Sequence, residues 1–239
     1  MLVFSCIVLS FTGIWIVGSS FVSRLQRDLE ERQEVLNVPL PVTLIGRGGL
    51  GFKGLRSLID QEATRPSPAY IVLHVGANDI VELSSYSWKA ELEVAVAYLR
   101  LIHPQSRLVW SDMLPRQEWR GTPYQEAAEK ARIRCQQRAR AIIWRKGGAV
   151  IHHADLAKGQ HLSADNVHLT EKGQQIFRRE LEEGILLIMN KFKYEEWFGP
   201  VELMDQPSAP RWSKWGKAGG PSPNGYSWRG PSPCVRILV

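Results

Sequence analysis

The sequence predicts an α/β fold in which five short strands form a mainly parallel sheet with helices between them. Two observations support this prediction. Short apolar runs alternate along the chain with segments whose apolar residues recur at helical spacing. Glycine or proline residues stand between several of these segments, where a chain must turn. At 239 residues, the chain suits one domain with an appendage better than two domains.

The pattern begins with a buried strand expected at residues 13–18, where the chain is apolar. Residues 21–36 are then expected to form a charged amphipathic helix, since their apolar side chains recur on one face. Pro39 and Pro41 follow this helix and end it, because proline lacks the N–H that a helix interior uses. The apolar run at residues 42–45 predicts a second strand, and a glycine-rich turn comes after it.

The middle of the chain repeats this alternation. Apolar residues around 55–59 fit a short helix, and residues 69–75 form an apolar run that predicts the third strand. Residues 88–102 carry apolar side chains at the i, i+3, i+4, i+7 spacing of an amphipathic helix. The fourth strand is expected at residues 107–111.

The last three elements complete the sheet and close the domain. Residues 124–144 predict a long basic helix that ends at a pair of glycines. The apolar residues 149–151 then begin a fifth strand. The closing helix is expected over residues 170–189, with Thr170 as its N-cap.

Both ends of the chain differ from this pattern. Residues 1–17 are almost entirely apolar and carry no charge, so a signal peptide or membrane anchor competes with a buried strand at 12–17. The run lacks a basic start and is shorter than the ~20 residues of a membrane span, which favours the strand and leaves residues 1–11 unassigned. Residues 199–239 are rich in Pro, Gly, Ser and Trp and predict a disordered basic tail, although a frame-derived tail has the same composition.

Charge and cysteine content limit the cellular setting. The net charge of +6 and the pI near 9.3 permit acidic partners such as nucleic acid without indicating one. Cys6, Cys135 and Cys234 are far apart and odd in number, so neither a disulfide framework nor a thiolate metal site is expected. We therefore expect a reducing, cytoplasmic location, with an anchored or secreted form left open by the apolar N-terminal run.

Polar motifs lie directly after expected strands or in the loop before the last helix. Ser20 ends a Gly-Ser-Ser block after the first strand, and Asn78 belongs to a Gly-Ala-Asn-Asp block after the third. Asp165 and His168 form an Asp-x-x-His pair before the closing helix. The carboxyl ends of parallel strands share one edge of the sheet, so these side chains should converge. Serine, histidine, aspartate and asparagine are the groups that acyl transfer requires.

The blocks resemble those of the SGNH (GDSL-type) hydrolase family, and they occur in the family's order. The resemblance covers about residues 12–190. It implies a three-layer α/β/α, flavodoxin-like fold, with an SGNH hydrolase-like domain at residues 12–192 and a basic tail at 193–239. The first and third blocks, Trp-Ile-Val-Gly-Ser-Ser-Phe-Val and His-Val-Gly-Ala-Asn-Asp, also resemble esterase-like domains carried by vertebrate retroelements.

The resemblance implies a role for one residue or pair in each block. Ser20 corresponds to the family's nucleophile, His168 to its general base, and Asp165 to the carboxylate that orients the histidine. The oxyanion hole would consist of the Ser20 N–H, the Gly49 N–H and the Asn78 side chain. No cofactor and no metal are implied, and the substrate would be a small ester.

One residue departs from the family pattern, and several of the motifs have an alternative interpretation. Ser19 stands where the family usually has an aspartate, so a carboxylate that helps to shape the loop is missing. Taken alone, the serines fit a helix N-cap, and the glycine and asparagine blocks fit ordinary turns. The adjacent His152 and His153 suggest a metal pair only superficially, since no carboxylate or thiol cluster accompanies them in the sequence.

Two functions of different classes therefore remain. The first is a serine esterase or deacetylase, which the retained serine, asparagine and Asp–His pair favour. The second is a catalytically degenerate binding module that contacts nucleic acid or protein through the basic helix at 124–144 and the tail. Ser19 and the Trp-rich tail favour the second function.

Overall fold

The protein is built as a three-layer α/β/α sandwich around one parallel sheet. The computed structural model describes residues 13–198, with side chains to residue 193. All strand pairs are parallel, in the order β2-β1-β3-β4-β5. The strands are β1 (Ile14–Gly18), β2 (Val42–Gly46), β3 (Tyr70–His74), β4 (Arg107–Ser111) and β5 (Ala149–Ile151). The predicted five-stranded parallel sheet and its flavodoxin-like strand order are confirmed.

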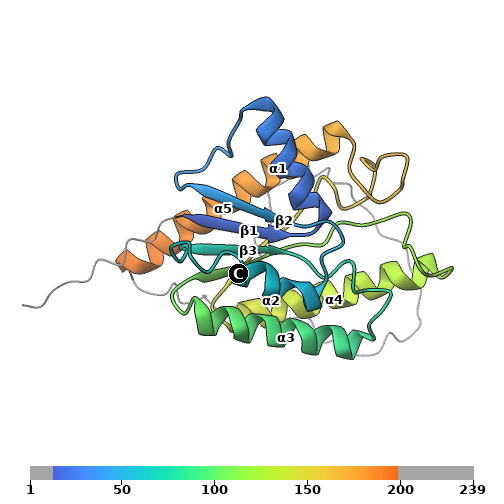
Figure 1. Ribbon diagram of the computed structural model, residues 1–239, viewed down its shortest axis with the longest axis horizontal. Helices are drawn as coiled ribbons and strands as arrows, with labels where there is room; N and C mark the ends of the chain where they lie inside the picture. Colours follow the sequence, from blue (N-terminus) through green and yellow to red (C-terminus); the bar gives the residue numbers. More distant parts are fainter. Residues whose placement is uncertain (1–12, 199–239) are drawn as a thin grey trace, which may run out of the picture.

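Helices cover both faces of this sheet (Figure 1). On one face lie α1 (Ser20–Arg32) and α5 (Glu171–Phe198). On the other face lie α2 (Phe52–Asp60), α3 (Ser85–Ile102) and α4 (Gln125–Arg145). Because both faces are covered, the strands are apolar along most of their length, as parallel strands usually are.

The side chains of each strand alternate between two hydrophobic cores. In β1, Trp15 and Val17 pack into the core beneath α2, α3 and α4, whereas Ile14 and Ile16 pack into the core beneath α1 and α5. All four side chains are buried. Polar residues are consequently excluded from β1, and the first polar side chains appear only where the strand ends.

Several helix ends differ from the sequence prediction, and α3 begins at Ser85 rather than at residue 88 because Ser84 caps it. α1 stops at Arg32 rather than at residue 36, because Gln33 adopts a left-handed conformation with φ of 55° and its N–H bonds back to the last turn. Leu36 is still buried, in the extended segment that follows. α5 continues to Phe198 rather than ending at residue 189, and its predicted cap is present, since Thr170 Oγ1 accepts the Gly173 N–H at 3.2 Å.

Some predictions fall outside the described part of the chain. The apolar start at residues 1–12 and the tail at 199–239 lie outside the described residues. The roles assigned to them, and the domain boundary near residue 192, stay predictions. Between residues 13 and 198, no helix has the length and apolar character that crossing a membrane requires.

The chain order places two loops side by side at one edge of the sheet. From β1 the chain passes to β2 on one side and then returns to β3 on the other side, so the strand order reverses at β1. Gly18 is paired with His74, and the Ser19 N–H reaches the His74 carbonyl at 3.4 Å. The Ser20 block and the Asn78 block are therefore neighbours at the switch point, where ligands bind in open parallel sheets.

Candidate active site

Ser20 is the first residue of α1 and directly follows the end of β1. Ser19 is the N-cap in an extended conformation and is buried, but its side chain accepts no capping hydrogen bond. The first N–H groups of α1 lack acceptors within the helix, and no acidic side chain occupies its first turn. The helix dipole and these N–H groups therefore favour negative charge beside the Ser20 hydroxyl.

His168 connects Ser20 to Asp165 in one continuous hydrogen-bonded chain. The His168 Nε2 atom lies 3.0 Å from Ser20 Oγ, and its Nδ1 atom lies 2.5 Å from Asp165 Oδ2. A carboxylate only accepts hydrogen bonds, so the neutral ring carries its proton on Nδ1. Nε2 is then free to accept the Ser20 proton. The structure thus brings together the three side chains that the Gly-Ser-Ser and Asp-x-x-His blocks pointed to.

Asp165 is held ionised by its own loop. Its Oδ1 atom accepts the backbone N–H groups of His168 and Val167, at 2.9 and 3.1 Å, and the Ser163 hydroxyl at 2.7 Å. These hydrogen bonds, with the His168 backbone N–H contributing most, hold the pKa of Asp165 well below its usual range. The carboxylate is therefore charged at any pH at which His168 can act as a base.

The His168 ring is also fixed by packing. Phe21, the residue after Ser20, lies with its ring centroid 5.9 Å from that of His168 and is itself buried against Phe177. The loop that carries His168 is closed by a hydrogen bond of 2.7 Å from the Ser163 N–H to the His168 carbonyl. Both contacts limit rotation of the imidazole away from Ser20.

Gly49 lies in a tight turn after β2. The Leu50 N–H donates to the Arg47 carbonyl at 3.1 Å, and Gly49 has a positive φ of 70°. This is the third position of a type II turn, where glycine is strongly favoured. The backbone at Gly49 borders the same cleft as Ser20, where the resemblance placed it.

Asn78 is oriented by two hydrogen bonds. Its Oδ1 atom accepts a hydrogen bond from Arg116 Nη2 at 3.0 Å, and its Nδ2 atom donates to the Leu50 carbonyl at 3.0 Å. The arginine only donates and the carbonyl only accepts, so the two contacts determine which side-chain atom is oxygen and which is nitrogen. The second N–H of Asn78 has no acceptor among the described residues.

The rest of the Asn78 block is structural. Gly76 has a positive φ of 90°, and a Cβ atom there would come within 2.6 Å of the Trp88 ring. Asp79 accepts the Phe52 N–H at the start of α2, at 3.1 Å to one oxygen, so it braces the loop as expected. Burial raises the pKa of Asp79 to about 6.

These groups line one open cleft of about 540 Å³ at the carboxyl ends of β1, β2 and β3. The predicted residues Ser20, Gly49, Asn78 and His168 all border it, and Asp165 lies behind His168. Four arginines that the sequence interpretation did not assign to the site also line the cleft: Arg24, Arg27, Arg116 and Arg120.

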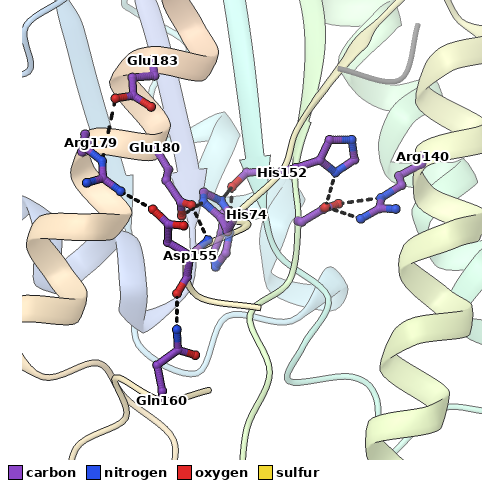
Figure 2. Close-up of polar contacts among 11 residues, drawn as sticks. His74, Arg140, His152, Asp155, Gln160, Arg179, Glu180 and Glu183 are labelled. Carbon is purple, nitrogen blue, oxygen red and sulfur yellow. Dashed lines mark hydrogen bonds and ion pairs between the residues drawn. The ribbon is translucent and has the colours of Figure 1, made fainter. Parts of the chain in front are cut away.

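A second serine–histidine contact lies inside the protein, in a network of which Figure 2 labels His74 and Glu180. The Ser111 Oγ atom is 2.8 Å from His153 Nε2 and 3.0 Å from His74 Nδ1, and His153 Nδ1 is 3.2 Å from Glu180 Oε2. Ser111 is 0% exposed, and both histidines are buried. No substrate can reach this serine, so the cluster is a buried polar network of the core.

The neighbouring Asp112 does not belong to that network. Its carboxylate binds Arg140 and accepts a hydrogen bond from His152 Nδ1 at 2.6 Å, as Figure 2 shows for the two labelled side chains. His152 and His153 thus contact different acidic partners. No group of three or more potential metal ligands is present among residues 13–193.

The basic helix α4 uses several of its arginines inside the protein. Arg132 donates to the Met113 carbonyl at 2.7 Å, Arg138 donates to the Ser85 carbonyl at 2.5 Å, and Arg140 pairs with Asp112. These contacts reduce the charge that α4 presents to solvent. Contact with nucleic acid through this helix stays a prediction.

Comparison with known proteins supports the fold through structure rather than sequence. Scans of the sequence found no match among protein-family models and none among curated proteins. Solved structures do match with probability 1.00.

A GDSL-like lipase from Bacteroides thetaiotaomicron is 15% identical and has a TM-score of 0.57, over 72% of this chain and 86% of that one. The psychrotrophic esterase EstA from Pseudoalteromonas sp. is 16% identical, with a TM-score of 0.55, over 74% and 98% of the two chains. A member of the lipolytic G-D-S-L family from Veillonella parvula is 19% identical, with a TM-score of 0.55, over 71% and 96%. The chain therefore has the three-layer fold of the SGNH (GDSL-type) hydrolases, as the sequence resemblance predicted.

Proposed function

We propose that the protein is a serine hydrolase that cleaves carboxylic esters. The observation that carries this proposal is the hydrogen-bonded chain from Ser20 through His168 to Asp165, which opens onto a cleft that Gly49 and Asn78 also line. Neighbours of the same fold support it, since they include a GDSL-like lipase and an esterase whose structure is described as inhibited by monoethylphosphonate.

In the first half-reaction, the Ser20 oxygen attacks the ester carbonyl while His168 Nε2 takes the hydroxyl proton. The imidazolium that forms is stabilised by the Asp165 carboxylate 2.5 Å from Nδ1. His168 then gives the proton to the alcohol as the carbon–oxygen bond breaks. The alcohol leaves, and the acyl group remains on Ser20.

In the second half-reaction, water takes the place of the alcohol. His168 removes a proton from the water, which attacks the acyl carbon, and the proton is returned to the Ser20 oxygen. The products are the free acid and the restored enzyme, and no cofactor takes part.

Negative charge develops on the carbonyl oxygen in both half-reactions. The donors that we propose to stabilise it are the Ser20 N–H at the start of α1, the Gly49 N–H and the second N–H of Asn78. Unlike water molecules, these donors need not reorient during the reaction, because the helix, the turn and the Arg116 contact hold them in place before the substrate binds.

Hydrolysis of a chromogenic short-chain ester tests the proposal. Wild type should release the chromophore, and Ser20→Ala should reduce the rate to that of the buffer. Ser57→Ala is the matched control, because Ser57 is an exposed serine on α2 outside the cleft. If wild type and Ser20→Ala hydrolyse a panel of short esters equally slowly, the proposal is wrong and the binding-module hypothesis becomes the working one.

A further inference from the structure

The cleft beside Ser20 carries a charge that ester hydrolysis alone does not require. The side chains that line it include four arginines and, among the described residues, no aspartate or glutamate. Several arginines elsewhere are paired with carboxylates: Arg32, on the same helix, binds both Asp28 and Glu171. The positive charge is therefore concentrated at the site rather than neutralised there.

Two of these arginines have no partner in the part of the chain that the structure describes. Neither Arg24 nor Arg27 forms an ion pair or a side-chain hydrogen bond with any described residue. Arg120 is 68% exposed and lies 3.9 Å from Asp165, at the outer limit of an ion pair. An anion entering the cleft would thus meet guanidinium groups that need not first release another carboxylate.

Arg116 lies deeper, and one of its hydrogen-bond donors lacks an acceptor among the described residues. Its Nη2 atom orients Asn78, but its Nε atom is buried without a hydrogen-bond partner among the described residues. Burial and the neighbouring Arg120 charge lower the pKa of Arg116 to about 10, so it stays protonated at neutral pH. A buried donor without a partner costs free energy unless a ligand or water accepts from it.

The arginines of α1 are placed at a defined distance from the nucleophile. Ser20, Arg24 and Arg27 follow the i, i+4, i+7 spacing, so they lie on one face of the helix, and all three border the cleft. At 1.5 Å per residue, Arg24 and Arg27 are about 6 Å and about 10 Å along the axis from Ser20. A group bound by them would lie a few bonds from an ester carbon at Ser20.

We propose that the cleft selects esters that carry a negatively charged group, a carboxylate or a phosphate, a few bonds from the scissile ester bond. This inference rests on the proposed ester hydrolysis by Ser20. The guanidinium fork matches the oxygens of both anions and binds them in two-pronged geometry. The anion can belong to the acyl part or to the alcohol part of the ester, and the experiment distinguishes the two.

The test compares matched charged and neutral esters by titration of the released acid. Monoethyl succinate carries the anion on the acyl side and is compared with the neutral ethyl butyrate. 2-Acetoxyethyl phosphate carries it on the alcohol side and is compared with the neutral ethyl acetate. The variants are Arg24→Gln/Arg27→Gln and the control Arg134→Gln, which removes an exposed arginine of α4 outside the cleft.

We expect wild type to prefer the charged member of at least one pair in kcat/KM. The double variant should lose up to about 25-fold of that preference, since each partly exposed charge pair contributes up to about fivefold. Its kcat/KM for the neutral esters should fall less than its kcat/KM for the charged esters, and Arg134→Gln should behave as wild type. Added salt should reduce the preference, because it screens exposed charges. An unchanged preference in the double variant would overturn the inference.

A binding measurement keeps the inference separate from catalysis. Ser20→Ala should bind the preferred charged ester in isothermal titration more tightly than its neutral counterpart, and adding Arg24→Gln/Arg27→Gln should remove the difference. If wild type hydrolyses no ester, the proposed function fails, and this titration still decides whether the cleft selects anions. Equal binding of charged and neutral esters by Ser20→Ala would refute anion selection.

Discussion

Replacing Asn78 with alanine tests the oxyanion hole most sharply. The substitution removes a donor that is fixed before the substrate binds, since Arg116 holds its oxygen and Leu50 accepts one of its N–H groups, each at 3.0 Å. The helix that supplies the Ser20 N–H has no hydrogen bond to this side chain. The turn that supplies the Gly49 N–H would lose the hydrogen bond from Asn78 to the Leu50 carbonyl, but it keeps its own bond from the Leu50 N–H to the Arg47 carbonyl. The change should therefore lower the turnover rate without disturbing the fold.

The expected magnitude follows from the position of the donor. Loss of one preorganised oxyanion donor costs about 10²–10³-fold in kcat, or about 3–4 kcal/mol. Asn78 is only partly buried, so water can replace some of the lost stabilisation, and we expect a value near the lower end, about 10²-fold. Substrate binding should change little, because the donor acts where charge develops.

The assay measures kcat and KM separately on a chromogenic acetate ester, with circular dichroism to confirm the fold. Asn78→Asp provides a second variant, since it keeps the size of the side chain but replaces the donors with negative charge, and it should lose at least as much activity. Asn37→Ala is the control, an exposed asparagine remote from the cleft. A kcat of Asn78→Ala within about threefold of wild type would refute the role of Asn78 in the oxyanion hole.

Three further predictions follow from other contacts. Asp165→Asn should lower kcat by about 10⁴-fold, because the amide no longer fixes the His168 tautomer; steady-state kinetics checks this, and a loss below tenfold would contradict it. Ser19→Asp should leave kcat unchanged or raise it, because a carboxylate at this uncapped N-cap can accept a helix N–H; a clear fall in kcat would show that the buried serine is required. Burial lowers the pKa of His74 from 6.5 to about 3. Below pH 6.5 the unfolded chain therefore takes up a proton that the folded chain does not, and the stability present above pH 6.5 is progressively lost towards pH 3. In urea unfolding, the free energy of unfolding should fall by about 1 kcal/mol between pH 7.5 and 5.5 because of His74. The His74→Gln variant should not show this contribution to the pH dependence. An identical pH slope in wild type and His74→Gln would exclude His74 as its source.

The strands could be predicted from sequence because they are buried on both faces. An apolar run such as residues 70–74 has no other stable place in a protein of this size, and the glycines and prolines mark its ends. The ends of α1 and α5 were harder to predict. The left-handed conformation of Gln33 leaves no sequence signal in a polar residue, and α5 continues because Phe192 still packs into the core.

The site residues that lie in short contiguous motifs could be predicted from the sequence. Ser20, Asn78 and the Asp165–His168 pair follow strands or precede a helix, so chain order alone places them at one edge of the sheet. Arg116 could not be found in this way, because it lies in a long irregular loop and its contact with Asn78 depends on the path of that loop.

Two other features needed three-dimensional information for different reasons. Arg24 and Arg27 were visible at helical spacing from Ser20, but charged residues on an amphipathic helix usually face solvent. The buried network around Ser111 combines side chains from β3, β4, the segment after β5 and α5. Only the paired strands and the packed helix bring those residues together, and no local pattern in the sequence marks them.

Labelling with a fluorophosphonate probe tests whether Ser20 is the nucleophile. We expect a single adduct on intact wild-type protein, located at Ser20 by peptide mass spectrometry, because among the described serines Ser20 combines an adjacent imidazole with an open cleft. Ser20→Ala should remain unlabelled, and Ser57→Ala should label as wild type does. Absence of an adduct on wild type, or an adduct at another serine such as Ser111, would contradict the assignment of Ser20 as the nucleophile.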